Sequence, residues 1–166
     1  MSRSLVWFRN DLRIADNPAL HGAFKYSRKP EIIALFFISP SNWKEHDWSP
    51  AKVNLALRSL SLLSKKLNSL NIPFLVEECS FKEAPSRIAQ ICERMNVGAV
   101  FANREYEVNE GKRDDAVKKA LKERGIELRM SEEQCVVPPH LLKLSNGKPH
   151  CVFTPYKVTI CALFTE

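Results

Sequence analysis

The sequence predicts an α/β protein with a doubly wound, parallel sheet. Two patterns indicate this class. Short apolar runs rich in β-branched and aromatic residues alternate with longer amphipathic stretches, and the central runs are almost continuously apolar. Strands that are apolar along their whole length are typical of parallel sheets covered by helices on both faces. Five such runs separated by helices predict a five-stranded, Rossmann-like sheet.

The predicted strands cover residues 4–8, 31–38, 73–77, 99–102 and 126–129. Each run is close to the usual strand length, and each is followed by a polar segment. Because parallel strands need long crossover connections, the stretches between the runs are expected to contain the helices.

Capping residues mark the starts of the first two predicted helices. Asp16 or Asn17 followed by Pro18 indicates an N-cap with proline at the first helical position, which opens a short helix. Ser49 and Pro50 form the same pattern, an N-cap followed by proline at the first helical position. The helix that follows them places six aliphatic side chains at helical spacing, so we expect one leucine-rich face to pack on the sheet. These side chains are Val53, Leu57, Leu60, Leu63, Leu67 and Leu70.

Two further helices are predicted over residues 81–95 and 111–124. In the second helix, Asp114 and Lys118 stand four residues apart, and so do Asp115 and Lys119. Opposite charges at this spacing are typical of a solvated helix face, and we expect that role here.

The sequence pattern changes after residue 131. Pro138, Pro139 and Pro155 interrupt the remaining stretch, which is expected to be irregular. We therefore expect an α/β domain over residues 1–131 and an interdomain segment over residues 132–166.

Composition limits the function classes. The 166 residues are 45% hydrophobic and 27% charged, the balance of a globular domain. No apolar run approaches a membrane span, and the charged N-terminus is unlike a signal peptide, so a cytoplasmic protein without membrane contact is expected. The net charge of +6 is compatible with a polyanionic partner such as DNA. The five cysteines lack metal-ligand spacing and are expected to be small buried side chains.

The polar segments after the first, second and fourth strands are the expected location of a ligand site, because ligands of open α/β sheets bind at the carboxyl ends of the strands. The five glycines are far apart, which disfavours a dinucleotide fingerprint or a phosphate-binding loop. Arg9, Asp11, Arg13 and Asp16 after the first strand are expected to pair with one another or to cap the next helix rather than to bind ligand.

Asn109 and Glu110 stand at the start of the last predicted helix of the α/β domain. There an amide and a carboxylate can hydrogen-bond the polar edge of a heterocycle, although Asn109 is equally compatible with a capping role. His46 is one of four scattered histidines, none of which has the spacing of a metal or catalytic site.

Several segments resemble the DNA photolyase and cryptochrome family. Residues 5–13 read LVWFRNDLR and residues 16–20 read DNPAL, which closely resembles the opening motif of that family. The resemblance continues through Trp43, His46, Ser49 and Pro50, through YEVNE at 106–110 with RD at 113–114, and through VFTPYK at 152–157. It is strongest to bacterial cyclobutane pyrimidine dimer photolyases with a folate antenna.

The resemblance implies that this chain is the amino-terminal, antenna-binding domain of a deoxyribodipyrimidine photolyase, a carbon–carbon lyase. Asn109 and Glu110 match positions that contact the pterin of methenyltetrahydrofolate, and His46 matches a residue of the same groove. FAD and damaged DNA would bind a larger helical domain, and no catalytic or metal-binding residue of the family falls in this chain. By itself the chain is therefore expected to be inactive in repair.

The agreement with the family stops after Lys157, where residues 158–166 read VTICALFTE. A truncated or interrupted photolyase fits this ending, and so does a naturally short protein. Two other functions remain compatible with the sequence: a cryptochrome-type signalling fragment, and a free-standing α/β domain that binds a small ligand. The expected partners are the antenna pigment, the helical FAD domain of the same protein and, through the full-length enzyme, damaged DNA.

Overall fold

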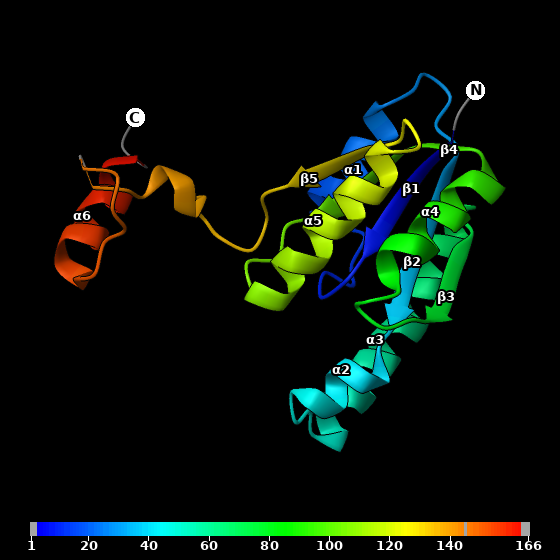
Figure 1. The fold of residues 1–166 in the computed structure, drawn as a ribbon, viewed down its shortest axis with the longest axis horizontal. Helices are drawn as coiled ribbons and strands as arrows, with labels where there is room; N and C mark the ends of the chain where they lie inside the picture. The colour runs from blue at the N-terminus through cyan, green and yellow to red at the C-terminus, as the bar shows by residue number, and fades with distance from the viewer. Residues whose placement is uncertain (1–2, 145, 164–166) are drawn as a thin grey trace. The chain divides into compact units, whose positions relative to one another are not determined.

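The computed structural model describes residues 3–144 and 146–163, which divide into two compact units, Met1–Ser131 and Glu132–Glu166 (Figure 1). The first unit contains one sheet of five parallel strands in the order β3-β2-β1-β4-β5. The strands are β1 (Arg3–Phe8), β2 (Ile32–Ile38), β3 (Phe74–Glu78), β4 (Val97–Asn103) and β5 (Glu127–Ser131). The predicted α/β class and five-stranded parallel sheet are confirmed.

Helices cover both faces of the sheet, as the apolar strands predict. The helices of the first unit are α1 (Pro18–Lys25), α2 (Pro40–Glu45), α3 (Pro50–Ser69), α4 (Ala84–Met95) and α5 (Val108–Lys122). Alternate residues of β1 enter two separate cores: Leu5 and Trp7 pack in the core shared with α4 and α5, and Val6 and Phe8 in the core shared with α1 and α3. Because successive side chains of a strand point to opposite faces of the sheet, β1 contributes to both cores.

The sheet reverses its winding direction beside β1. The chain runs outward from β1 to β2 and β3, then crosses back to pair β4 against the other edge of β1. The segments after β1 and β4 therefore begin side by side at the carboxyl edge of the sheet. This arrangement is a topological switch point, where open α/β sheets bind ligands.

Local signals gave the starts of α1 and α3 correctly, whereas the helices predicted over residues 81–95 and 111–124 begin at Ala84 and Val108. Asn17 is the N-cap of α1, and its side-chain oxygen accepts a hydrogen bond from the Leu20 amide at 3.1 Å. Ser49 caps α3 in the same way, since its hydroxyl oxygen accepts from the Lys52 amide at 3.3 Å. Each cap satisfies an amide that would otherwise lack a partner within the helix.

Helix α3 packs on the sheet only along its second half. Leu60, Leu63 and Leu67 are buried, but Leu57 and Leu70 of the predicted leucine face are each 45% exposed. The expectation of one continuous buried face was therefore wrong, because the N-terminal half of α3 extends past the strands and Leu70 is the C-cap residue at the other end of the helix. The N-terminal half reaches the short helix α2, which the sequence did not predict and which lies beyond the carboxyl end of β2 (Figure 1).

The second unit is not wholly irregular, contrary to expectation. It contains the 3₁₀ helix η1 (Pro139–Leu141) and the helix α6 (Phe153–Leu163), and Lys143 forms an isolated antiparallel bridge with Pro149. Pro155 stands in the first turn of α6, where a proline is tolerated, rather than interrupting the helix. Residues 164–166 of the divergent ending lie outside the described residues. No helix among the described residues is long and apolar enough to cross a membrane.

The one-sided packing of α3 leads to a stability prediction for two adjacent leucines. Leu63 is 1% exposed and Leu62 is 59% exposed on the same helix. We expect Leu63→Ala to lower the free energy of unfolding by about 2–5 kcal/mol, because it removes buried surface and leaves a cavity. Leu62→Ala changes the same atoms at an exposed site and should have an effect within about 0.5 kcal/mol. Urea denaturation followed by circular dichroism measures both values, and equal losses would contradict the packing.

Candidate functional site

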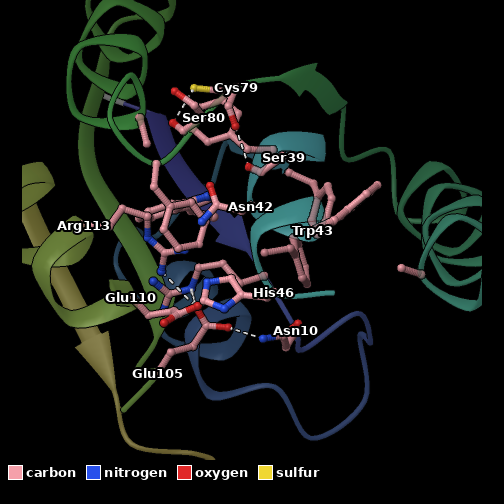
Figure 2. Close-up of a pocket in the computed structure, with 18 of the residues that line it drawn as sticks. Asn10, Ser39, Asn42, Trp43, His46, Cys79, Ser80, Glu105, Glu110 and Arg113 are labelled. Atoms are coloured by element: carbon pink, nitrogen blue, oxygen red, sulfur yellow. Dashed lines mark hydrogen bonds and ion pairs between the residues drawn. The ribbon is translucent and has the colours of Figure 1, made fainter. Parts of the chain in front are cut away.

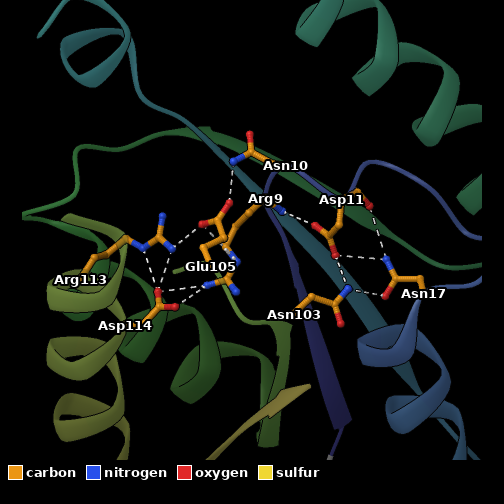
Figure 3. Close-up of polar contacts among 8 residues, drawn as sticks. All are labelled: Arg9, Asn10, Asp11, Asn17, Asn103, Glu105, Arg113 and Asp114. Carbon is orange, nitrogen blue, oxygen red and sulfur yellow. Dashed lines mark hydrogen bonds and ion pairs between the residues drawn. The ribbon is translucent and has the colours of Figure 1, made fainter. Parts of the chain in front are cut away.

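Asp11 and two asparagines join the segments after β1 and β4 to the start of α1 (Figure 3). One carboxylate oxygen of Asp11 accepts a hydrogen bond from the Arg9 amide at 2.8 Å, and the other accepts from Asn17 at 3.1 Å and Asn103 at 2.6 Å. The Asn103 side-chain oxygen in turn accepts from the Ala19 amide at 3.0 Å. Asp11 thus has the structural role that we expected for it, since both of its carboxylate oxygens already accept hydrogen bonds from the protein.

Two arginines and two carboxylates form a second, buried network beside the first (Figure 3). Arg9 Nη1 donates to both oxygens of Asp114 at 3.0 and 2.9 Å, and Arg113 Nη2 donates to Asp114 at 2.7 Å and to Glu105 at 2.9 Å. All four residues are buried. Because the formal charges cancel, the network keeps ionised groups in the interior without a net buried charge.

Trp7 of β1 supports this network from the sheet. The guanidinium carbons of Arg9 and Arg113 lie 4.8 and 4.7 Å from the Trp7 ring centroid. Two cations against one indole ring gain cation–π attraction that is strengthened by burial. The expected solvated face at Asp114 was wrong: its carboxylate turns inward to the two arginines instead of pairing with Lys118.

A cavity with a volume of about 100 Å³ opens between these segments, α2 and the turn after β3 (Figure 2). Seven aromatic rings line it: Trp7, Phe8, Phe36, Phe37, Trp43, Trp48 and Phe81. Its polar lining includes Asn10, Asn42, His46, Ser80, Glu105, Glu110 and Arg113. Aromatic walls with a few polar groups are the usual composition of a small-molecule site.

The structure brings the three site residues predicted from the sequence into one neighbourhood. His46, the C-cap of α2, and Glu110, in the first turn of α5, both line the cavity. Asn109 lines an adjoining groove, and its Nδ2 lies 3.4 Å from His46 Nε2. The N-cap residue of α5 is Glu107, so Asn109 does not have the capping role that we considered.

Sequence reasoning missed most of the cavity wall. Trp48 stacks on Trp43 with a centroid distance of 5.5 Å and an interplanar angle of 13°, and Lys52 Nζ lies 3.8 Å from the Trp48 ring centroid. Trp43 and Trp48 lie close together in the polar segment after β2, and this pattern could have predicted an aromatic wall there. Phe81 and Ser80 carried no such signal, because only the fold brings the turn after β3 to the switch point.

One buried donor group in the cavity wall has unused hydrogen-bonding capacity. Arg9 Nε and Nη2 have no hydrogen-bond partner among the described residues, although Nε lies 3.7 Å from Glu105 Oε2. The Arg9 side chain is only 5% exposed. A buried donor without a partner is costly, so an acceptor atom supplied by a ligand would be favourable here.

The cysteines provide no reactive group in the cavity. Burial raises the pKa of Cys79, which lines the cavity, to about 11 and that of Cys92 to about 12, so both are protonated thiols at neutral pH. Burial was expected for all five cysteines, but Cys135 is only partly buried and Cys151 and Cys161 are exposed. Among the described residues no cluster of histidine, cysteine or acidic side chains could hold a metal ion.

Comparison with known proteins identifies the family. The DNA photolyase family model matches residues 4–166. The chain belongs to the DNA photolyase family. The deoxyribodipyrimidine photo-lyases of Vibrio cholerae and Escherichia coli are each 35% identical to it, over 161 and 158 residues. The matches cover 96% and 95% of this chain but only 34% and 33% of the two relatives, so the chain spans about a third of their length.

Solved structures of this photolyase family share the fold. A cryptochrome of Synechocystis sp. PCC6803 superposes with a TM-score of 0.84 at 25% identity, over 98% of this chain and 34% of the cryptochrome. A class III photolyase of Agrobacterium tumefaciens superposes with a TM-score of 0.74 at 25% identity, over 93% of this chain and 30% of the photolyase. Both family branches named by the sequence resemblance therefore contain this α/β domain.

The buried network leads to a prediction about two neighbouring aspartates. Asp114→Ala leaves Arg9 and Arg113 in the interior with Glu105 as their only carboxylate in the network, so we expect a loss of about 3–5 kcal/mol in unfolding free energy. Asp115, next in the chain, is exposed, and Asp115→Ala should change stability by no more than about 0.5 kcal/mol. Guanidinium unfolding monitored by tryptophan fluorescence gives both values. A small effect of Asp114→Ala would show that the network does not stabilise the fold.

Proposed function

We propose that this chain is the light-harvesting, antenna-binding domain of a deoxyribodipyrimidine photolyase and that its cavity binds methenyltetrahydrofolate. The single observation that carries the proposal is the meeting of Asn109, Glu110 and His46 at the rim of an aromatic cavity. His46 is the C-cap residue of α2 and stands 63 residues before Asn109 of α5.

The residues at the rim suit a pterin. A pterin is a flat heterocycle whose edge carries an amino group and a ring N–H beside a carbonyl oxygen. The Glu110 carboxylate can accept two hydrogen bonds from neighbouring N–H donors, and the Asn109 amide can both donate and accept. The aromatic walls offer stacking surfaces for the ring, and the unpaired donors of buried Arg9 favour a ligand with acceptor atoms.

The size of the cavity supports a site that is shared with another domain. Its volume of about 100 Å³ is below the roughly 300 Å³ at the lower end of small-molecule sites. We propose that a helical FAD domain of the same protein supplies the remaining wall. The bound pigment would absorb light and pass the excitation energy to FAD in that domain, where pyrimidine dimers in DNA are split.

In this proposal the full-length protein is a cytoplasmic DNA-repair lyase. This chain contributes the antenna site and no residue of the repair chemistry, so the purified chain should leave thymine dimers unchanged under blue light. A chain that repaired dimers alone would contradict the division of roles.

A second candidate is a cryptochrome-type signalling fragment, which the TM-score of 0.84 with the Synechocystis cryptochrome favours. The two candidates make the same prediction for the antenna site and differ in the partner domain. Restoring the family's helical domain and assaying repair of thymine dimers separates them, since only the photolyase would reverse the lesion.

Ligand titration tests the antenna site in this chain. We expect methenyltetrahydrofolate to bind with a change in its near-ultraviolet absorbance. Asn109→Ala removes one hydrogen-bonding group from the rim and should weaken binding about 3- to 10-fold. The matched control is Asn68→Ala at an exposed position of α3, which should bind as the unaltered chain does. Equal affinities of the two variants, or no binding of the folate by any of them, would contradict the assignment.

A further inference from the structure

The positive charge of the chain is concentrated in one helical layer of the first unit. Helices α1 and α3 pack on the same face of the sheet, in one core with Val6 and Phe8. Residues 17–30, which contain α1, and residues 48–76, which contain α3, include no aspartate or glutamate. The two segments contain these lysines and arginines: Lys25, Arg28, Lys29, Lys52, Arg58, Lys65 and Lys66. Their summed positive charge exceeds the net charge of +6 of the whole chain.

The opposite layer, formed by α4 and α5, contains acidic as well as basic residues, and several of its cations are paired. Arg87 lies 2.6 Å from Glu77, and Arg124 lies 2.7 Å from Glu93. Six exposed cations of the α1 and α3 segments form no ion pair or side-chain hydrogen bond among the described residues. These six define the basic face: Lys25, Arg28, Lys29, Arg58, Lys65 and Lys66.

The ends of α1 and α3 border one groove, so the two segments form one surface. Phe24 in the last turn of α1 and Leu70, the C-cap residue of α3, both line this groove at the amino end of the strands. Among the described residues that line it, only Glu31 is acidic, and its carboxylate lies 3.0 Å from Arg3 Nε. Glu31 therefore does not offset the charge of the basic face.

The helix dipole explains only part of this charge. Lys25 and Lys66 stand in the last turns of α1 and α3, where a cation interacts favourably with the helix dipole. Arg58 and Lys65 lie before the last turn of α3, seven residues apart, and both are exposed. Seven residues are about two helical turns, so these two side chains lie on one side of the helix. Because like charges on one surface repel each other, a partner with many negative charges would be favourable here.

The side chains between the cations indicate the kind of polyanion. Ser61, Asn68 and Ser69 are exposed on α3. In protein–DNA interfaces, hydroxyl and amide groups hydrogen-bond phosphate oxygens together with lysine and arginine. We propose that the basic face binds the phosphate backbone of duplex DNA. Such contacts carry no sequence information, so undamaged DNA of any sequence should bind.

The basic face is separate from the antenna site. Its six residues line neither the aromatic cavity nor the groove beside it. The groove at Phe24 lies at the amino end of the strands, whereas the cavity lies at their carboxyl end. In the proposed function the lesion is repaired in another domain, so this surface would contact DNA outside the lesion. The proposal does not depend on the bound pigment.

Binding of an undamaged duplex over a series of salt concentrations tests the basic face. We expect the 166-residue chain to raise the fluorescence anisotropy of a labelled duplex, with an association constant that falls as salt is added. Lys65→Ala/Lys66→Ala should make the slope of log K against log salt shallower by about 2, because each lysine at a phosphate contributes about 0.9. Arg28→Ala/Lys29→Ala should have a similar effect from the other segment.

The matched control is Lys118→Ala/Lys119→Ala, which removes the same charge from exposed positions of α5 in the opposite layer. This variant should keep the slope of the unaltered chain. If it flattens the slope as much as Lys65→Ala/Lys66→Ala does, net charge rather than the basic face attracts DNA, and the proposal is overturned. It is also overturned if the unaltered chain does not bind the duplex at low ionic strength.

Two other polyanions distinguish DNA from a membrane or an acidic protein. Phe24 and Leu62 are exposed in the same layer, and apolar groups beside lysines are also typical of membrane-binding helices. If phosphatidylglycerol vesicles bind the chain and the duplex does not, the surface binds membranes and the proposal is overturned. The proposal also fails if poly-glutamate displaces the labelled duplex as well as unlabelled DNA does at equal charge. None of these assays contains a folate, so their outcome is independent of the antenna site.

Discussion

The arrangement of the site depends on the buried ion network of Arg9, Glu105, Arg113 and Asp114. Arg9 follows β1, Glu105 follows β4, and the other two belong to α5. Charged groups are costly to remove from water, so each of these side chains is stable in the interior only when its partners are present. The network therefore joins three segments in one relative position. Asp11, with Asn17 and Asn103, adds the start of α1 to the same assembly.

This constraint places the first turn of α5 next to α2. Because Arg113 is held between Glu105 and Asp114, residues one turn earlier on α5 are presented at the switch point. Glu110 then lines the cavity, and Asn109 reaches His46. Trp7 has two functions in this region, since its ring supports both arginines and also forms part of the cavity wall. Stability and ligand geometry thus depend on the same side chains.

The distribution of exposed apolar surface agrees with a domain that works beside another one. The N-terminal half of α3 extends past the sheet and leaves Leu55 and Leu57 exposed, and the cavity is small. The relatives are about three times as long as this chain, as the covered share of 34% indicates. A second domain of the kind proposed for the antenna site would cover these leucines and enlarge the cavity.

The sequence by itself determined the features that depend on neighbouring residues. The apolar runs predicted every strand, and Asn17 and Ser49 marked the helix starts, because capping and strand burial are read within a few positions. Only the tertiary structure decided where Asp114 points, that α2 lines the cavity, and that Lys82 and Lys112 line one groove. Spacing along the helix favoured Lys118 as the partner of Asp114, but its carboxylate accepts hydrogen bonds from Arg113 and from Arg9, which is 105 residues away. Such contacts join residues far apart in the chain, and the burial that makes them favourable exists only once the sheet has formed.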